Sequence, residues 1–221
     1  MNKGKELFLE EFNRKIRECE KFCFMSRGKE FQQECIKKLI LFKQKVNSFK
    51  KKAIESEDEE FANYMLSLEY LIEAIVEELK MWVALKEDRP SDAWDSLINA
   101  QLSVRRAAQA HSIAVDFNVE GYANKLYLLE KLLFPPQVFL SPSFIIEKAE
   151  CSICGKEYGE CEHVVGKAYK GKMCYRIIKG IKGVKEVSIV EKPANKRARV
   201  FLITDDDGIT RDFMTWREIR K

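Results

Sequence analysis

Residues 151–163 have the sequence CSICGKEYGECEH, which places three cysteines and a histidine in one short segment. The Cys-x-x-Cys turn of Cys151 and Cys154 brings two thiolates to one metal ion, and Cys161 and His163 complete a tetrahedral set. The only other histidine of the chain is His111. Four protein ligands leave no open coordination position, so the cluster predicts a structural Zn²⁺ site rather than a catalytic one.

Cys174 leaves the fourth ligand open, because this residue either replaces His163 at the metal or lies buried beside the site. The chain of 221 residues has seven cysteines, and four of them fall between residues 151 and 174. An odd and clustered set of thiols favours metal binding in a reducing compartment, the cytoplasm, over disulfides. A small domain also gains stability from a bound metal.

The residues that follow the cluster predict a small β-rich domain. Residues 185–191 alternate between polar and β-branched side chains, and residues 197–203 are read as a second strand. Asp207-Gly208 is a strong hairpin-turn dipeptide. Residues 214–221 are expected to close the domain with a helical turn.

Upstream of the cluster, apolar residues recur at intervals of three and four, which predicts about five helices. The expected boundaries are a break at residues 26–28, a capping box at residues 56–59, a stop and restart at residues 89–92, and Pro135-Pro136. Three cysteines lie on the apolar helix faces and are expected to pack there as small hydrophobic residues. They are Cys19, Cys23 and Cys35. Glu77 and Glu78 are expected on a helix surface.

Together these patterns predict an α+β chain with three parts. Residues 1–134 form an α-helical bundle or a helical-repeat-like domain, residues 135–150 form a partly packed linker, and residues 151–221 form a zinc-binding β-rich domain. The charge changes at the same place: residues 1–150 contain 23 basic and 25 acidic side chains, whereas residues 151–221 contain 16 and 10. Apolar runs such as residues 39–42 are far too short to span a membrane, and the N-terminus has no signal-peptide core.

Basic residues are concentrated after the cluster, since residues 151–200 contain 12 lysines and arginines against 5 acidic residues. The candidate nucleic-acid- or partner-binding residues are Lys167, Lys170, Lys172, Arg176, Lys179, Lys196, Arg197 and Arg199. Tyr158, Tyr169 and Tyr175 lie among them as stacking platforms for bases. A solvated lysine-rich face, or a surface that attracts an acidic protein, explains the same pattern.

Two further stretches, GKAYKGKMCY at residues 166–175 and EVSIVEKPAN at residues 186–195, follow the cysteine cluster. In this order, residues 151–200 resemble the C-terminal part of proteins of tailed phages and related mobile elements, including some prohead-protease-like head-maturation proteins. The resemblance implies a phage or mobile-element setting. Those proteases use a His and a Ser in a β-rich core upstream of such a tail. The upstream part of this chain is predicted to be helical and offers no matching pair, so the resemblance implies no catalytic residue.

The sequence thus predicts a non-enzymatic zinc-binding adaptor or regulator that binds a protein or nucleoprotein complex. One alternative is a protein that binds DNA or RNA through the basic zinc domain. A further alternative is a divergent phage head-maturation peptidase, which requires a nucleophile and a base in close contact.

Overall fold

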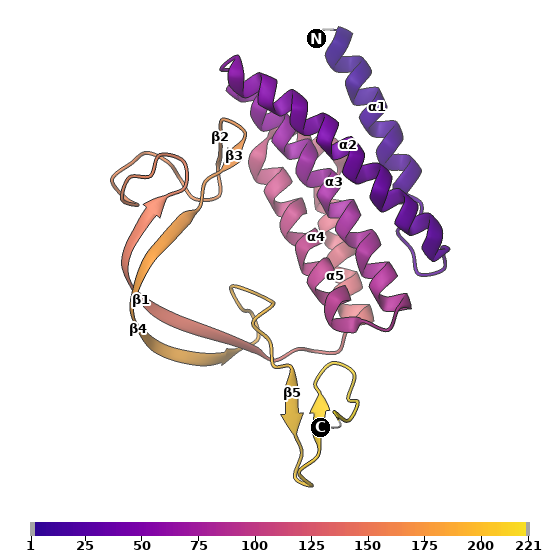
Figure 1. The fold of residues 1–221 in the computed structure, drawn as a ribbon, viewed down its shortest axis with the longest axis vertical. Coiled ribbons are helices and arrows are strands. Elements are labelled where there is room, and N and C mark those ends of the chain that lie inside the picture. Colours follow the sequence, from indigo (N-terminus) through magenta and orange to yellow (C-terminus); the bar gives the residue numbers. More distant parts are fainter. Residues whose placement is uncertain (1–2, 220–221) are drawn as a thin grey trace. The chain divides into compact units, whose positions relative to one another are not determined.

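Helices come first along the chain and strands follow in the computed structural model, which describes residues 3–219 (Figure 1). The helices are α1 (Lys3–Glu20), α2 (Lys29–Glu55), α3 (Glu59–Lys86), α4 (Pro90–Ala110), the 3₁₀ helix η1 (Ser112–Phe117) and α5 (Val119–Leu133). The strands are β1 (Phe139–Cys151), β2 (Ala168–Tyr169), β3 (Lys172–Met173), β4 (Arg176–Val190), β5 (Leu202–Thr204) and β6 (Thr210–Asp212). The predicted α+β class is therefore confirmed.

The chain separates into two compact units. One unit consists of Met1–Leu126 and Ala168–Lys172, and the other consists of Tyr127–Lys167 and Met173–Lys221. We call them the helical unit and the ribbon unit. Residues 139–150, expected to be a linker, form most of β1. Pro142 is tolerated there because β1 is an edge strand, in which a missing backbone N–H leaves no ladder bond unmade.

The core of the helical unit is built around α3, which packs against both α2 and α4. Apolar side chains from four helices meet there without access to solvent. Phe12, Leu39, Leu68 and Leu97, one from each of α1 to α4, are at most 1% exposed. Along α2, for example, the buried residues Cys35, Leu39, Phe42 and Val46 recur every three or four positions, because these positions share one helix face.

Local signals set most helix ends where the sequence predicts them. Gly28 is the N-cap of α2, and Pro90 occupies the first turn of α4, where the missing N–H of proline leaves no bond unmade. α5 ends at Leu133, just before Phe134 and the two prolines. The cap of α3 differs from the predicted box. Asp58 accepts a 3.0 Å hydrogen bond from the backbone N–H of Phe61, whereas Ser56 ends α2.

The substitution Asp58→Ala is therefore expected to destabilise the protein by about 1 kcal/mol, because it leaves an N-terminal amide of α3 without its side-chain acceptor. Urea denaturation followed by circular dichroism measures the change. Ser56→Ala is the control, since the Ser56 hydroxyl donates only to the carbonyl of Ala53. A larger loss in Ser56→Ala than in Asp58→Ala would restore the predicted capping box.

The ribbon unit is built on the antiparallel pair of β1 and β4, which runs from the pair Phe139–Val190 to the pair Cys151–Arg176. Residues 185–190 of the predicted strand form the last part of β4, which begins nine residues earlier at Arg176, and Glu191 lies outside the strand. Of residues 197–203 only the last two belong to a strand, β5, and Arg199 makes an isolated bridge to Phe139.

A second, shorter hairpin joins β5 to β6, and its turn contains Asp207-Gly208 as predicted, with Gly208 at a φ of 78°. Residues 214–219 form turns and an isolated bridge rather than the expected helical turn, because Glu218 pairs with Arg211 of β6. Arg220 and Lys221 lie outside the described residues.

Candidate metal centre

The cysteine cluster begins where β1 ends. Cys151 is the last residue of that strand, and its backbone N–H donates to the carbonyl of Lys156 at 2.9 Å. The backbone N–H of Gly155 donates back to the carbonyl of Cys151, also at 2.9 Å. Gly155 closes this turn at a φ of 72°, a conformation that glycine adopts without strain. The turn holds the two cysteines of the Cys-x-x-Cys motif on one side of the backbone.

Four candidate ligand atoms come together at this turn. One atom each from Cys151, Cys154, Cys161 and His163 lies within 4.8 Å of the other three. In a tetrahedral zinc site with Zn–S bonds near 2.3 Å the sulfurs are about 3.8 Å apart. The donor set therefore fits a metal ion after a small contraction, and three thiols with one imidazole are donors that structural zinc sites use.

Backbone hydrogen bonds to the sulfur of Cys151 stabilise its thiolate form, which is the form that binds a metal. Burial alone disfavours the thiolate, but the backbone N–H groups of Cys154 and Ile153 donate to this sulfur, and the pKa of Cys151 falls to about 6. The N–H of Ile153 lies 3.4 Å from the sulfur atom. The same donors that stabilise a thiolate stabilise a metal-bound sulfur, since both carry negative charge.

The second pair of ligands follows on a loop without regular secondary structure. The backbone N–H of His163 donates to the sulfur of Cys161, as the N–H of Ile153 does to Cys151. The Nδ1 atom of the His163 ring is buried. Each half of the cluster thus combines a ligand sulfur with a backbone donor two residues later.

Cys174 lies beside the cluster but outside the group of four mutually close ligands. Its sulfur is 3.9 Å from that of Cys151, and burial together with the hydrogen bond to Cys151 raises the pKa of Cys174 to about 11. Backbone bonds to Gly166 and Lys167 hold the residue in place. Cys174 is thus a buried thiol next to Cys151, and His163, not Cys174, belongs to the group of four mutually close ligand atoms.

The candidate basic residues have different surroundings. Lys170 and Lys172 belong to the helical unit, and the other six belong to the ribbon unit. Lys167, Arg176 and Lys179 are exposed. Lys179 pairs with Glu150 at 3.2 Å, and Lys196 pairs with Glu130 at 2.5 Å. Arg199 is only 3% exposed and lies 4.3 Å from the centre of the Phe201 ring. The packing of Arg199 has no local signal in the sequence.

The other thiols and the second histidine have structural surroundings. Cys19, Cys23 and Cys35 are at most 5% exposed in the helical unit, and burial raises the pKa of Cys19 to about 12. His111 accepts from the backbone N–H of Ile113 at 2.9 Å and contacts Glu60 through Nε2 at 2.7 Å. These hydrogen bonds account for both ring nitrogens of His111.

The pair Glu77-Glu78, expected on a helix surface, is buried: Glu77 is 8% exposed and Glu78 is 0% exposed. Glu78 is the more deeply buried of the two. Its side chain is fully buried and contacts the ammonium group of Lys125 and the hydroxyl group of Tyr122, both at 2.7 Å. Both partners come from α5, more than 40 residues further along the sequence. No local sequence pattern therefore predicts this buried ion pair.

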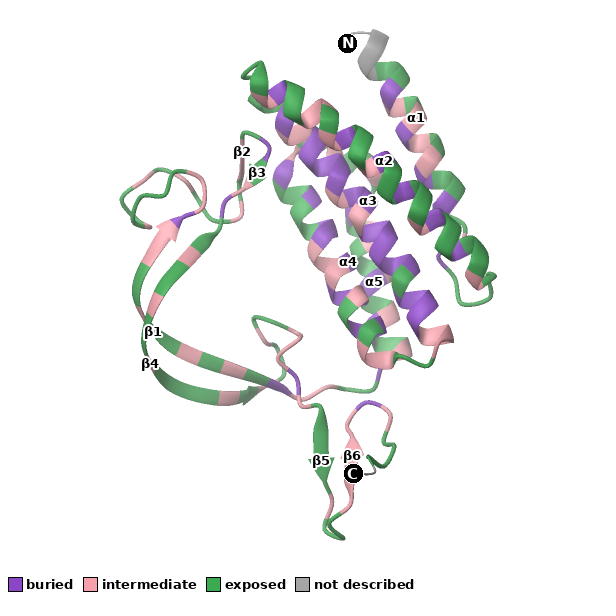
Figure 2. Cartoon of the chain, in the orientation of Figure 1, coloured by how far each residue is buried: buried purple, intermediate pink, exposed green. Residues whose placement is uncertain are grey.

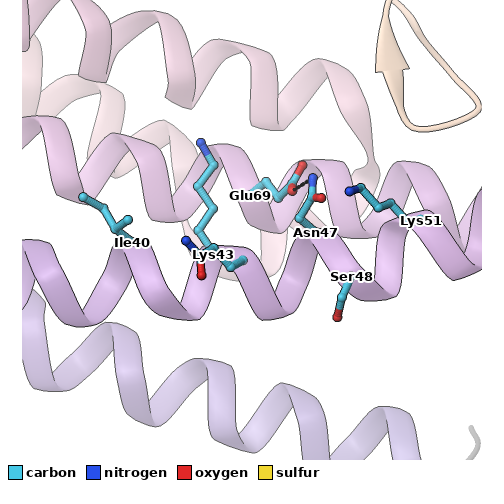
Figure 3. A pocket seen from close by; sticks show the side chains of 7 residues that line it. Ile40, Lys43, Asn47, Ser48, Lys51 and Glu69 are labelled. Atoms are coloured by element: carbon cyan, nitrogen blue, oxygen red, sulfur yellow. Dashed lines mark hydrogen bonds between the residues drawn. The ribbon is translucent and has the colours of Figure 1, made fainter.

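A shallow pocket of about 430 Å³ lies between α2 and α3 (Figure 3). Its polar wall is formed by Glu69, which accepts a hydrogen bond from Asn47 at 2.7 Å, and by Lys43 and Lys51. Lys50 also pairs with Glu69. These interactions neutralise the carboxylate and join two neighbouring helices, so the pocket is explained by helix packing.

Comparisons of the sequence with family models, with curated proteins and with solved structures find no match. Among the described residues, none of the helices has both the length and the apolar composition that crossing a membrane requires.

Proposed function

We propose that the cluster binds one structural Zn²⁺ through Cys151, Cys154, Cys161 and His163. The observation that carries this proposal is the convergence of three thiols and one imidazole within 4.8 Å. Soft thiolate and imidazole donors favour zinc over magnesium or calcium, and a complete set of four ligands leaves no position for a substrate. The ion would staple the loop of residues 151–174 to the end of β1, in a reducing compartment such as the cytoplasm.

On this basis the protein acts as a non-enzymatic adaptor or regulator that binds a protein or nucleoprotein complex. Its two units offer separate surfaces, and the zinc ion keeps the ribbon unit folded. The resemblance of residues 151–200 to the C-terminal parts of phage proteins supports a phage or mobile-element setting. The helices that precede residue 135 in the described part of the chain argue against the peptidase alternative, whose family carries a β-rich core there.

Removal of zinc with a chelator is expected to raise amide hydrogen exchange throughout residues 151–167 by at least about tenfold, because apo zinc motifs lose their fold. The circular dichroism of the helices should remain, since the core of the helical unit contains no ligand. Exchange that is unchanged after chelation would refute the staple.

The adaptor role is tested by affinity capture with the tagged full chain, followed by mass spectrometry. The zinc-loaded wild type is expected to retain a partner that Cys154→Ser releases. Cys35→Ser is the matched control, because Cys35 is a buried thiol of the helical unit. If the wild type and both variants retain the partner equally, binding of the partner does not depend on the zinc site.

Binding of single-stranded nucleic acid by the ribbon unit is a second candidate, favoured by a basic and aromatic pair and by a further exposed tyrosine near the cluster. The guanidinium of Arg176 lies 5.2 Å from the centre of the Tyr158 ring, and Tyr175 is 59% exposed. Phosphate contacts predict an affinity that falls steeply as salt rises. Gel shifts with DNA and RNA at two salt concentrations test this candidate, and absence of binding at low salt would remove it.

A further inference from the structure

The two-stranded ribbon of β1 and β4 has one face that is apolar from the pair Leu140–Ile189 to the pair Ala149–Ile178. Residues paired across a sheet share a face, and the faces alternate from each pair to the next. Applied to the observed register, this rule assigns one face to Leu140, Pro142, Phe144, Ile146 and Ala149 of β1 and to Ile178, Ile181, Val184, Val187 and Ile189 of β4. We call these ten residues the apolar ribbon face. The opposite face mixes serines, glycines, charged residues and a few apolar ones.

The apolar ribbon face is open to solvent. Its β4 side chains Ile181, Val184, Val187 and Ile189 are 53%, 60%, 59% and 75% exposed, and Phe144 of β1 is 42% exposed. Figure 2 shows exposed and half-buried residues along most of the ribbon. Contiguous exposed apolar patches above a few hundred Å² mark binding sites, and an isolated two-stranded hairpin is only marginally stable in water. Both facts indicate that a partner covers this face.

The edge of β4 is not suited to accept another strand. The register skips Lys179, Lys182 and Lys185, so each of these lysines is the extra residue of a β-bulge. Bulges interrupt the ladder of hydrogen bonds, and lysines on an edge oppose the addition of a strand. On the edge of β1, Glu147 is skipped in the same way. An occupant therefore docks on the face, with its own backbone hydrogen bonds already satisfied, as those of an α-helix are.

The basic residues beside the apolar ribbon face favour a helix that carries acidic side chains. Arg176 and the three bulged lysines of β4 recur at every third residue, and Glu186 is the only acidic residue of this strand. Lys179 pairs with Glu150 of β1 at 3.2 Å, so Lys182 and Lys185 carry the proposed charge contacts. We propose that the apolar ribbon face binds an amphipathic α-helix of a protein partner, with apolar residues three and four apart and flanking acidic residues that meet these lysines. This inference rests on the proposed adaptor function and specifies its partner. A second copy of the chain would bring the two rows of lysines together, and nucleic acid would leave the apolar side chains without a complementary surface.

The test is selection from a displayed library of helical peptides of about 18 residues, or five turns, on the zinc-loaded full chain. The recovered peptides are expected to be acidic, with apolar residues at helical spacing. Ile181→Asp should weaken their binding by at least about tenfold, since the new carboxylate would be desolvated against the peptide. Ile145→Asp is the matched control, because Ile145 is 52% exposed but lies on the opposite face. Lys182→Glu should weaken binding, and Lys148→Glu, on the opposite face, should not.

Three outcomes would overturn the inference. Recovered peptides that are basic or lack helical spacing would contradict the partner chemistry, and equal losses in Ile181→Asp and Ile145→Asp would contradict the assigned face. If sedimentation shows that the wild type is a dimer and that Ile181→Asp is a monomer, the apolar ribbon face binds a second copy of the chain. If the inference fails while captured partners still depend on zinc, the adaptor function stands and only this surface is wrong.

Discussion

Replacement of Cys151 by serine is expected to lower the affinity for zinc by more than roughly 100-fold. Changing a residue that only supports a metal ligand costs up to about 100-fold, and the loss of a ligand itself should cost more. Cys151 is the ligand most integrated into the fold, because it ends β1, is 1% exposed and receives backbone hydrogen bonds on its sulfur. A serine hydroxyl at this position is a poor zinc ligand at neutral pH. Competition with a chromophoric chelator measures the affinity, and metal analysis after gel filtration measures the zinc content.

The control for Cys151→Ser is Cys174→Ser, because Cys174 is buried at 3.9 Å from the same sulfur but lies outside the group of four ligands. We expect Cys174→Ser to keep one zinc ion per chain with a more modest loss of affinity. If the two variants lose zinc equally, Cys174 is a ligand and the proposed set is wrong. Full zinc content in Cys151→Ser would contradict the site itself.

Replacement of Leu68 by alanine is expected to destabilise the helical unit by about 2–5 kcal/mol, which approaches the whole stability of many domains. Leu68 is fully buried on α3, the helix that packs against both α2 and α4, so its truncation leaves a cavity at the centre of the core. The shift of the urea midpoint, read from the helical circular dichroism, measures the loss.

Leu41→Ala is the matched comparison, because it makes the same chemical change on α2 at a residue that is 65% exposed. This variant should change the stability by no more than about 0.5 kcal/mol. Equal effects of the two substitutions would mean that α3 is not the centre of the core.

Features that depend on nearby residues were predictable from the sequence. The start of α2 follows Gly28, the start of α4 coincides with Pro90, and the β5–β6 turn contains Asp207-Gly208. The grouping of the candidate ligands was predictable for the same reason, because a Cys-x-x-Cys turn and a nearby Cys-x-His segment need only short loops to meet.

Features that depend on distant partners were not predictable. Glu78 has the sequence context of a surface residue, and only its contacts with Lys125 and Tyr122 explain its burial. Likewise, the three-residue spacing of lysines in β4 matches no regular strand, because the side chains of a strand alternate every two residues. Because Lys179, Lys182 and Lys185 are bulge residues, β4 pairs with β1 in spite of this three-residue spacing. Only the observed register of the two strands identifies the bulges.

X-ray absorption at the zinc edge of the purified full chain tests the central claim most directly, because it counts the atoms bound to the metal. The predicted result is one zinc ion per chain with three sulfurs at about 2.3 Å and one nitrogen at about 2.0 Å. The variant His163→Ala should lose the nitrogen. A shell of four sulfurs in the wild type would assign Cys174 in place of His163, and a shell of oxygens, or no bound zinc, would contradict the structural zinc site.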